Sequence, residues 1–252
     1  EDEPVTAMAL QPTGDNTLLA AAAGGLYRWD GMAGQWHREG ETPGGLVALE
    51  ATGDILAGVD AEARLWLRDA PGSAWRTLTG PWAGQAVLRV LLGNTAADGA
   101  SEPALTVLTA RPTEQGHYAM TVWQRSGDWR ELAALAADIP AALALWPQGR
   151  DLFLALQHRV VRLFTDPASG DLAVAQYFFA EGEQVTALAC GTARLWAATT
   201  AALYRGDATG AQWTLVGALP GGAPVIALTE EAGRLTAVTL GGGCWRAEVA
   251  DE

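Results

Sequence analysis

The 252-residue chain contains no lysine, since all sixteen of its basic residues are arginine. This absence excludes chemistry that needs a lysine amine, such as Schiff-base formation, attachment of pyridoxal phosphate or a P-loop. Acidic residues number 29, so the formal net charge is −13. Nucleic acid is therefore not an expected partner, because phosphate binding needs clustered Lys and Arg. A protein partner, if charged, is expected to be basic.

Long apolar runs, histidine and cysteine are also scarce. No apolar run approaches the ~20 residues that span a bilayer, so no membrane insertion is expected. The three histidines, His37, His117 and His158, show no metal-ligand spacing, and no metal or other cofactor is expected. Cys190 and Cys244 are placed on strands too far apart for a bridge. We expect two free, mostly buried thiols, which favour a reducing compartment, while the missing initial Met leaves secretion open.

A unit of roughly 40 residues recurs six times along the chain. Each unit begins with a small or β-branched residue followed by alternating apolar positions, at Val5, Leu46, Val87, Pro140, Val185 and Val225. The successive spacings of 41, 41, 53, 45 and 40 residues match the ~40–50 residues of one β-propeller blade. We therefore predict one propeller domain over residues 1–252, with blades at about 5–45, 46–86, 87–139, 140–184, 185–224 and 225–252.

Four short strands are expected in each complete unit, bounded by Gly, Asp, Asn and Pro. In the first unit they are Val5–Gln11, Thr17–Ala23, Leu26–Asp30 and Gln35–Glu41, and in the fifth Val185–Cys190, Arg194–Thr200, Leu203–Gly206 and Gln212–Gly217. Apolar stretches of five to seven residues are too short for ordinary amphipathic helices. The predicted fold class is an all-β, six-bladed β-propeller with four-stranded antiparallel blades.

A turn motif lies between the third and fourth strands, where Asp is followed by Gly and then Trp. The expected structural turns are at Asp30, Asp69, Asp128 and Asp207, and the fourth unit keeps Asp166 without the Trp. An Asp side chain accepts hydrogen bonds from the backbone of its own turn, and Gly adopts positive φ. A buried Trp ring covers roughly 150–250 Å², so we interpret most of the eleven Trp residues as blade packing.

These turns resemble the Asp-box, or sialidase-type, repeat of β-propellers. The segment Gly25-Leu-Tyr-Arg-Trp-Asp30, with Gly34 and Trp36 behind it, is similar to that family's strand, turn and Trp element. The resemblance implies a structural turn away from any catalytic mouth. WD-repeat propellers are the second family considered, on the single dipeptide Trp29-Asp30.

No catalytic constellation emerges from the sequence. A retaining sialidase needs an arginine cluster and a supported Tyr nucleophile, whereas Arg89 is the only arginine expected on an inner strand. Paired glycines such as Gly24-Gly25 and Gly44-Gly45 are interpreted as turns, because no helix follows them to hold an anion. We therefore do not expect an enzyme.

Propeller geometry gathers two sets of loops on one face, those after each fourth strand and those between the second and third strands. The candidate partner-binding residues there are Glu41, Trp82, Arg111, Glu114, His117, Tyr118, His158, Arg159, Glu181 and Glu183, and Asp60, Glu62 and Asp138 are expected on the same face. Unit three lengthens two loops beside Trp82, at 93–103 and 110–117. Trp82 is either an exposed anchor or a ring packed between blades two and three.

The last unit is expected to have only three strands, Val225–Thr229, Arg234–Leu240 and Cys244–Val249, and the segment Glu1–Pro4 is too short to supply a fourth. An unpaired strand edge is a liability unless it is covered or used. Either a partner strand adds there or the chain is part of a longer protein; alternatively Glu248, Asp251 and Glu252 discourage pairing by charge. The predicted function is a soluble, non-catalytic protein-interaction scaffold, with a carbohydrate-binding propeller or a glycoside-processing enzyme as alternatives.

Overall fold

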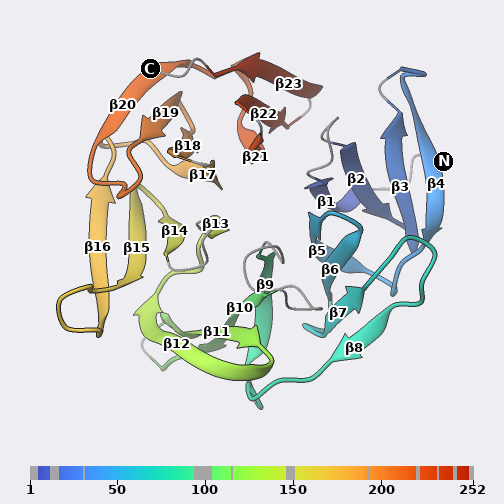
Figure 1. The fold of residues 1–252 in the computed structure, drawn as a ribbon, viewed down its shortest axis with the longest axis horizontal. Helices are drawn as coiled ribbons and strands as arrows, with labels where there is room; N and C mark the ends of the chain where they lie inside the picture. Colours follow the sequence, from blue (N-terminus) through green and yellow to red (C-terminus); the bar gives the residue numbers. More distant parts are fainter. Residues whose placement is uncertain are drawn as a thin grey trace. The chain divides into compact units, whose positions relative to one another are not determined.

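The computed structural model describes residues 5–11, 17–30, 32–93, 104–114, 116–145, 151–191, 193–219, 222–231, 233–240 and 243–249. Glu1–Pro4, the loop 94–103, Asp251 and Glu252, to which the sequence analysis assigned roles, lie outside these ranges. The regular structure of the described residues consists of strands, and none of them belongs to a helix able to cross a membrane. The fold is a six-bladed β-propeller (Figure 1).

The chain divides into two compact units at the boundary between the third and fourth blades, Glu1–Ala137 and Asp138–Glu252. The first unit holds blades 1 to 3. Blade 1 contains β1 (Val5–Gln11), β2 (Thr17–Ala22), β3 (Gly25–Asp30) and β4 (Gln35–Glu41). Blade 2 contains β5 (Leu46–Thr52), β6 (Ile55–Asp60), β7 (Leu65–Arg68) and β8 (Arg76–Leu78). Blade 3 contains β9 (Ala86–Leu92), β10 (Leu105–Pro112), β11 (Tyr118–Ser126) and β12 (Asp128–Ala137).

The second unit holds blades 4 to 6. Blade 4 contains β13 (Ala142–Leu145), β14 (Leu152–Leu156), β15 (Arg159–Thr165) and β16 (Leu172–Phe178). Blade 5 contains β17 (Val185–Cys190), β18 (Leu195–Thr199), β19 (Ala202–Gly206) and β20 (Trp213–Ala218). Blade 6 contains only β21 (Val225–Glu231), β22 (Arg234–Thr239) and β23 (Gly243–Glu248). The prediction of four-stranded blades with a three-stranded last blade is therefore confirmed.

Strands pair antiparallel with their sequence neighbours in every blade, as hairpin connections require. The strand limits expected for the first and fifth units differ from the structure by at most one residue at each end. The second long loop expected in blade 3 is shorter than predicted, because β10 continues to Pro112 and pairs there with Tyr118.

The core lies between successive blades of each unit, because side chains of a strand alternate between its two faces. In the first unit, Ala7 and Ala9 of β1 pack with Leu49 and Ala51 of β5. In the second, Ala187 and Ala189 of β17 pack with residues of β21 such as Leu228. Small side chains let the inner strands approach closely, and each fully buried Leu around them contributes about 1.5–3 kcal/mol.

A polar residue at the end of the second strand binds an aromatic residue of the third strand in several blades. The indole N–H of Trp66 donates to Asp60 (2.9 Å), that of Trp123 to Thr109 (3.1 Å) and that of Trp245 to Thr239 (3.3 Å). In blade 5, Thr199 and the Tyr204 hydroxyl both donate to Glu183. These bonds satisfy polar atoms that burial would otherwise leave without partners.

Two rim tryptophans connect neighbouring blades of the first unit. Trp75 Nε1 of blade 2 donates to the Glu41 carbonyl of blade 1 at 2.9 Å, and Trp129 Nε1 of blade 3 donates to the Thr79 carbonyl of blade 2 at 3.1 Å. Trp213 of blade 5 instead donates to Gly210 in its own turn, and its ring lies 5.3 Å from that of Phe179. Each ring therefore fixes an outer strand or its turn through both packing and one hydrogen bond.

The Asp turns are of two kinds. Oδ1 of Asp30 accepts from the backbone N–H of Met32 and Ala33, and Oδ1 of Asp207 accepts from Thr209 and Ala211. Asp69 instead binds Arg76 through both carboxylate oxygens at 3.1 Å, and its turn is closed by Ser73 bonding Ala70. Asp128 begins β12 and pairs across from Ser126.

Both cysteines are free, as predicted, but the expected burial of both is wrong for Cys244. Cys190 is half-buried, whereas Cys244 is exposed together with every other residue of β23. The reason is that β23 is the last strand of blade 6, where the other blades add a fourth strand.

Candidate functional site

The structure divides the sequence-predicted face between the two units. In the first unit, Arg111, Glu114, His117 and Tyr118 lie together at the β10–β11 hairpin, where the Thr113 N–H donates to the His117 carbonyl. Arg111, Glu114 and His117 are exposed and Tyr118 is half-buried. Glu41 ends β4 and offers its carbonyl to Trp75, with its side chain in solvent.

Trp82 packs between blades 2 and 3, which was the second of the two alternatives for this residue. Its ring is half-buried against the core between blades 2 and 3 and meets Trp129 edge-on, with centroids 4.8 Å apart. A Cβ at Gly80 would lie 2.0 Å from this ring, so the glycine makes room for it. The ring therefore serves packing and is not an exposed anchor.

Asp60 acts as a structural acceptor. It is buried and accepts from the backbone of Glu62 and Arg64, from Arg64 Nε at 2.7 Å and from Trp66. Burial alone would raise the pKa of Asp60, but these hydrogen bonds and the Arg64 charge outweigh it and lower the pKa. Glu62 is exposed and pairs with Arg64.

In the second unit, His158 and Arg159 lie at the β14–β15 hairpin. The His158 ring is 5.7 Å from that of Phe178, and Arg159 donates to Gln176 at 3.2 Å. Asp138 accepts from Gln157 beside a cavity of about 180 Å³. Glu181 is exposed, whereas Glu183 is engaged by Thr199 and Tyr204. Burial raises the pKa of Tyr204, and the Glu183 carboxylate raises it further.

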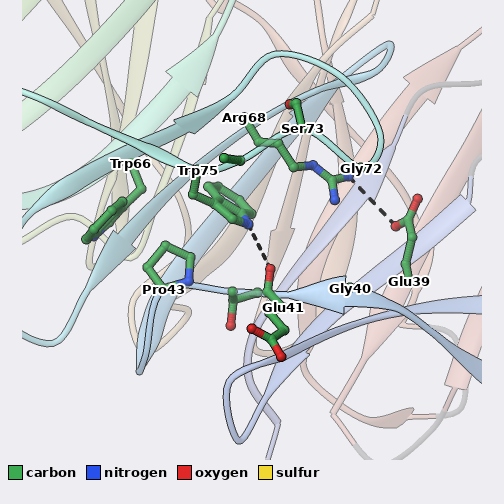
Figure 2. Close-up of a pocket in the computed structure, with 11 residues that line it drawn as sticks. Glu39, Gly40, Glu41, Pro43, Trp66, Arg68, Gly72, Ser73 and Trp75 are labelled. Carbon is green, nitrogen blue, oxygen red and sulfur yellow. Dashed lines mark hydrogen bonds and ion pairs between the residues drawn. The ribbon is translucent and has the colours of Figure 1, made fainter.

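A larger cavity of about 370 Å³ lies in the first unit, between the outer strand of blade 1 and the third strand of blade 2. Its lining comes from β4 and the residues after it, from β7 and from the β7–β8 loop (Figure 2). The lining residues are Glu39, Gly40, Glu41, Thr42, Pro43, Trp66, Arg68, Gly72, Ser73, Ala74 and Trp75.

A buried guanidinium lies at the centre of this cavity's wall. Arg68 is only 3% exposed, and its guanidinium carbon is 5.8 Å from the centroid of the Trp75 ring. Burial lowers the pKa of Arg68, and nearby Glu39 acts in the opposite direction. Figure 2 shows the side chain extending over the Trp75 ring toward Glu39. Its Nη2 is 3.9 Å from Glu39 Oε2, which is longer than a hydrogen bond.

The sequence analysis identified Trp75, which forms one wall of this cavity, but did not identify Arg68 as a functional residue. Trp75 was placed at the blade rim by its Asp-Gly-Trp turn, but Arg68 was not singled out. The available signal was the arginine at the end of Leu65-Trp-Leu-Arg68, where Leu65 and Leu67 face the core and Trp66 and Arg68 face the other side. Among the described residues, no group of His, Cys, Asp or Glu is arranged to hold a metal ion.

Comparison with known proteins identifies similar folds but no matching family. No model of a protein family matches the chain, and no curated protein sequence matches it. Among solved structures it is similar to the β-propeller domain of Myceliophteria thermophila Cps50 (Swd1), with TM-score 0.58 and 16% identity over 99% of this chain and 85% of that one. Nidogen in a nidogen/laminin complex matches with TM-score 0.62 and 14% identity over 90% of this chain and 84% of that one.

The extracellular domain of the putative hybrid two-component system BT4673 from B. thetaiotaomicron matches with TM-score 0.61 and 11% identity. The match covers 98% of this chain but only 33% of that one. At such low identity, these similarities support the six-bladed propeller fold alone.

Proposed function

We propose that this chain is a non-catalytic protein-interaction propeller that binds an extended segment of a partner protein along the free edge of β23. The observation that carries the proposal is the three-stranded last blade. Every residue of β23 is exposed, and within the described part of the chain β22 is its only pairing partner. Unpaired N–H and C=O groups on such an edge are a template for strand addition.

The backbone groups on the free edge follow from the register. The Val249 N–H donates to the Gly233 carbonyl on the β22 side, and the β22–β23 register contains no bulge. Because antiparallel backbone groups alternate between the two edges, those of Cys244, Arg246 and Glu248 point away from β22. Three residues in one row offer a partner strand several main-chain hydrogen bonds.

The surroundings favour an apolar segment with basic flanks. Trp245 on β23 is 43% exposed, and Leu240, which follows β22, is exposed as well. Outer strands of the same unit also expose apolar side chains, including Val174 and Phe178 on β16 and Leu215 on β20. The chain's net charge of −13 attracts a basic partner and repels an acidic one.

Fold similarity adds general support. The similar structures include nidogen in a complex with laminin, so a propeller of this architecture can serve as a binding partner. The turns at Asp30 and Asp207, with their backbone hydrogen bonds, support the resemblance to the Asp-box repeat.

The test compares two substitutions at one position. Arg246→Pro removes the N–H that faces the free edge and leaves the β22 ladder intact, whereas Arg246→Ala removes the same side chain and keeps the N–H. Wild type and both variants are used as baits in lysate of the source cells, and retained proteins are quantified by mass spectrometry. Amide hydrogen exchange of β23 is then measured in the purified complex.

We expect a partner that is retained by wild type and Arg246→Ala, is lost with Arg246→Pro, and slows exchange of the Arg246 and Glu248 amides. Equal retention by Arg246→Pro, or a partner that leaves the β23 amides unprotected, would overturn strand addition. Enzymatic turnover in the purified chain would overturn the non-catalytic assignment.

A further inference from the structure

The cavity between β4 and β7 contains a buried donor without an acceptor. No hydrogen bond reaches Nε of Arg68, although the side chain is almost fully buried. Leaving a buried N–H without an acceptor is unfavourable, because the group has lost its hydrogen bonds to water and gained none in return. Its position on the cavity wall means that an occupant of the cavity is the group that can supply an acceptor.

A second, half-buried arginine in the protein shows the contrast. The guanidinium of Arg162 lies 4.3 Å from the centroid of the Phe164 ring, an arrangement like that of Arg68 over Trp75. Arg162 donates through Nε and Nη2 to Asp151 and through Nη1 to the Thr209 carbonyl. All three guanidinium nitrogens of Arg162 therefore donate hydrogen bonds, whereas Nε of Arg68 donates none.

Glu39, which lies beside the Arg68 guanidinium, also has an atom without a hydrogen-bond partner. Glu39 Oε1 accepts from Arg28 at 2.7 Å, but Oε2 is buried without a hydrogen bond. The gap of 3.9 Å between Glu39 Oε2 and Arg68 Nη2 is too long for a direct hydrogen bond. The cavity wall thus presents the Arg68 guanidinium beside a carboxylate oxygen that has no hydrogen bond, and a group that both accepts and donates can bridge the two.

The aromatic walls of the cavity are held in place by hydrogen bonds to other groups of the protein. Trp66 Nε1 donates to Asp60, and Trp75 Nε1 donates to the Glu41 carbonyl (Figure 2). Fixed rings need no ordering when a ligand binds, which favours affinity. The face of an indole is electron-rich and attracts C–H groups that carry partial positive charge.

We propose that this cavity binds one saccharide residue. A ring hydroxyl accepts from Arg68 and donates to Glu39, and a neighbouring hydroxyl uses the remaining guanidinium N–H groups, while the C–H face of the sugar ring packs on Trp75 and Trp66. The cavity volume of about 370 Å³ lies within the ~300–1,000 Å³ of small-molecule sites. This activity goes beyond protein interaction at β23 and is independent of it.

A hydroxyl fits the wall better than an organic carboxylate does. A carboxylate satisfies Arg68 but leaves Glu39 Oε2 without a donor and places two negative groups together. The charges that act on Arg68 are those of Glu39 and Asp54 and that of Arg28, which pairs with Glu39, so the local charge is close to balanced and suits a neutral ligand. A binding experiment with a neutral saccharide and an organic carboxylate can therefore distinguish the two kinds of ligand.

The experiment follows the indole N–H signals of Trp66 and Trp75 by NMR in protein labelled with ¹⁵N-tryptophan, with assignment from Trp→Phe variants. The probes are the methyl glycosides of glucose, galactose, mannose and N-acetylglucosamine, with benzoate as the carboxylate probe. The variants are Arg68→Met, Glu39→Gln and, as a control at a half-buried arginine that also lies over an aromatic ring but is not among the cavity's lining residues, Arg162→Met. Circular dichroism establishes that each variant is folded, and Glu39→Gln tests the site even if Arg68→Met does not fold.

We expect at least one glycoside to shift both indole signals saturably, with a dissociation constant of about 1 mM or tighter. Loss of a charged hydrogen-bond partner in Arg68→Met or Glu39→Gln is expected to weaken binding by about tenfold or more, while Arg162→Met binds as wild type does. The proposal is overturned if no glycoside gives saturable shifts, if only benzoate does, or if folded Arg68→Met and Glu39→Gln bind like wild type.

Discussion

The indole N–H of Trp196 in β18 donates a hydrogen bond to Oε2 of Glu230 in β21, so that blades 5 and 6 share a polar contact across their packed faces. Trp196 is buried in the cluster between these blades. Gly191 makes the contact sterically possible, because a Cβ there would lie 2.2 Å from Glu230 Oε2. Because Gly191 has no side chain, the Glu230 carboxylate can reach the buried Trp196 N–H.

Glu230→Ala is expected to destabilise the fold by about 1–3 kcal/mol, because it leaves the buried Trp196 N–H without an acceptor. Gly191→Ala should cost a similar amount by displacing the carboxylate. Since both changes break the same contact, the double variant should cost clearly less than the sum of the two. Urea unfolding of the four proteins measures this coupling, and strictly additive costs would contradict the shared contact.

The repeat made the blades predictable from sequence. Strand limits in units one and five followed from alternating apolar residues and from turn residues, because both signals are local. The missing fourth strand of blade 6 followed from counting residues after Cys244. The pairing of Trp75 with Glu41 did not follow, because it joins residues 34 apart in sequence and depends on the packing of two blades.

The cavity around Arg68 was not predicted, because the position of Arg68 in the alternating pattern does not show what packs against it. An arginine near the end of a strand is most often solvated, and its burial depends on Glu39 and Trp75, which come from a different blade and a different loop. The residues expected on the loop face were chosen by their place in the repeat. The structure places Arg111, Glu114 and His117 in solvent but engages Glu183 within its own blade, and partner binding at this face stays a prediction.

Two turn glycines with nearly the same backbone angle provide a matched test of packing. Gly34 has φ of 65° and Gly210 has φ of 66°. A Cβ at Gly34 would meet nothing within 4 Å, whereas one at Gly210 would lie 3.1 Å from Leu195 and 3.2 Å from Phe153. Gly34→Ala should cost only the left-handed backbone penalty of about 1–2 kcal/mol, and Gly210→Ala should cost more. Equal shifts in the urea midpoint would contradict this.

The two thiols should differ in reactivity. Burial, together with the Asp151 carboxylate, raises the pKa of Cys190, and burial raises that of Cys244 against the opposing effect of Arg246. Cys244 is nevertheless exposed on β23. Native protein treated with iodoacetamide should therefore gain one label, at Cys244, faster at pH 9 than at pH 7 because the thiolate is the nucleophile.

Intact mass and peptide mapping identify the labelled site, and protein unfolded in urea serves as the control with two labels. Equal labelling of both thiols in the native protein would contradict the difference in exposure.

Glu50 on the inner strand β5 should make stability depend on pH. Burial raises its pKa to about 8 from the ordinary 4.5. Below about pH 4.5 the carboxyl is protonated in both states; between 4.5 and 8 the unfolded chain releases the proton while the native protein keeps it. The contribution of Glu50 to stability therefore falls as pH rises through this window and is constant above it. Because Glu50 is half-buried, we expect a total loss of about 1–3 kcal/mol.

Glu50→Gln removes the titration, so the stability of this variant relative to wild type should increase steadily from pH 5 to pH 8 in urea unfolding. Glu41→Gln makes the same chemical change at a side chain that is 88% exposed and serves as the matched control. Parallel stability curves for wild type and Glu50→Gln would mean that Glu50 ionises in the native protein as it does in the unfolded chain. A rise confined to pH 5–8 would instead locate a neutral carboxyl on β5 at physiological pH.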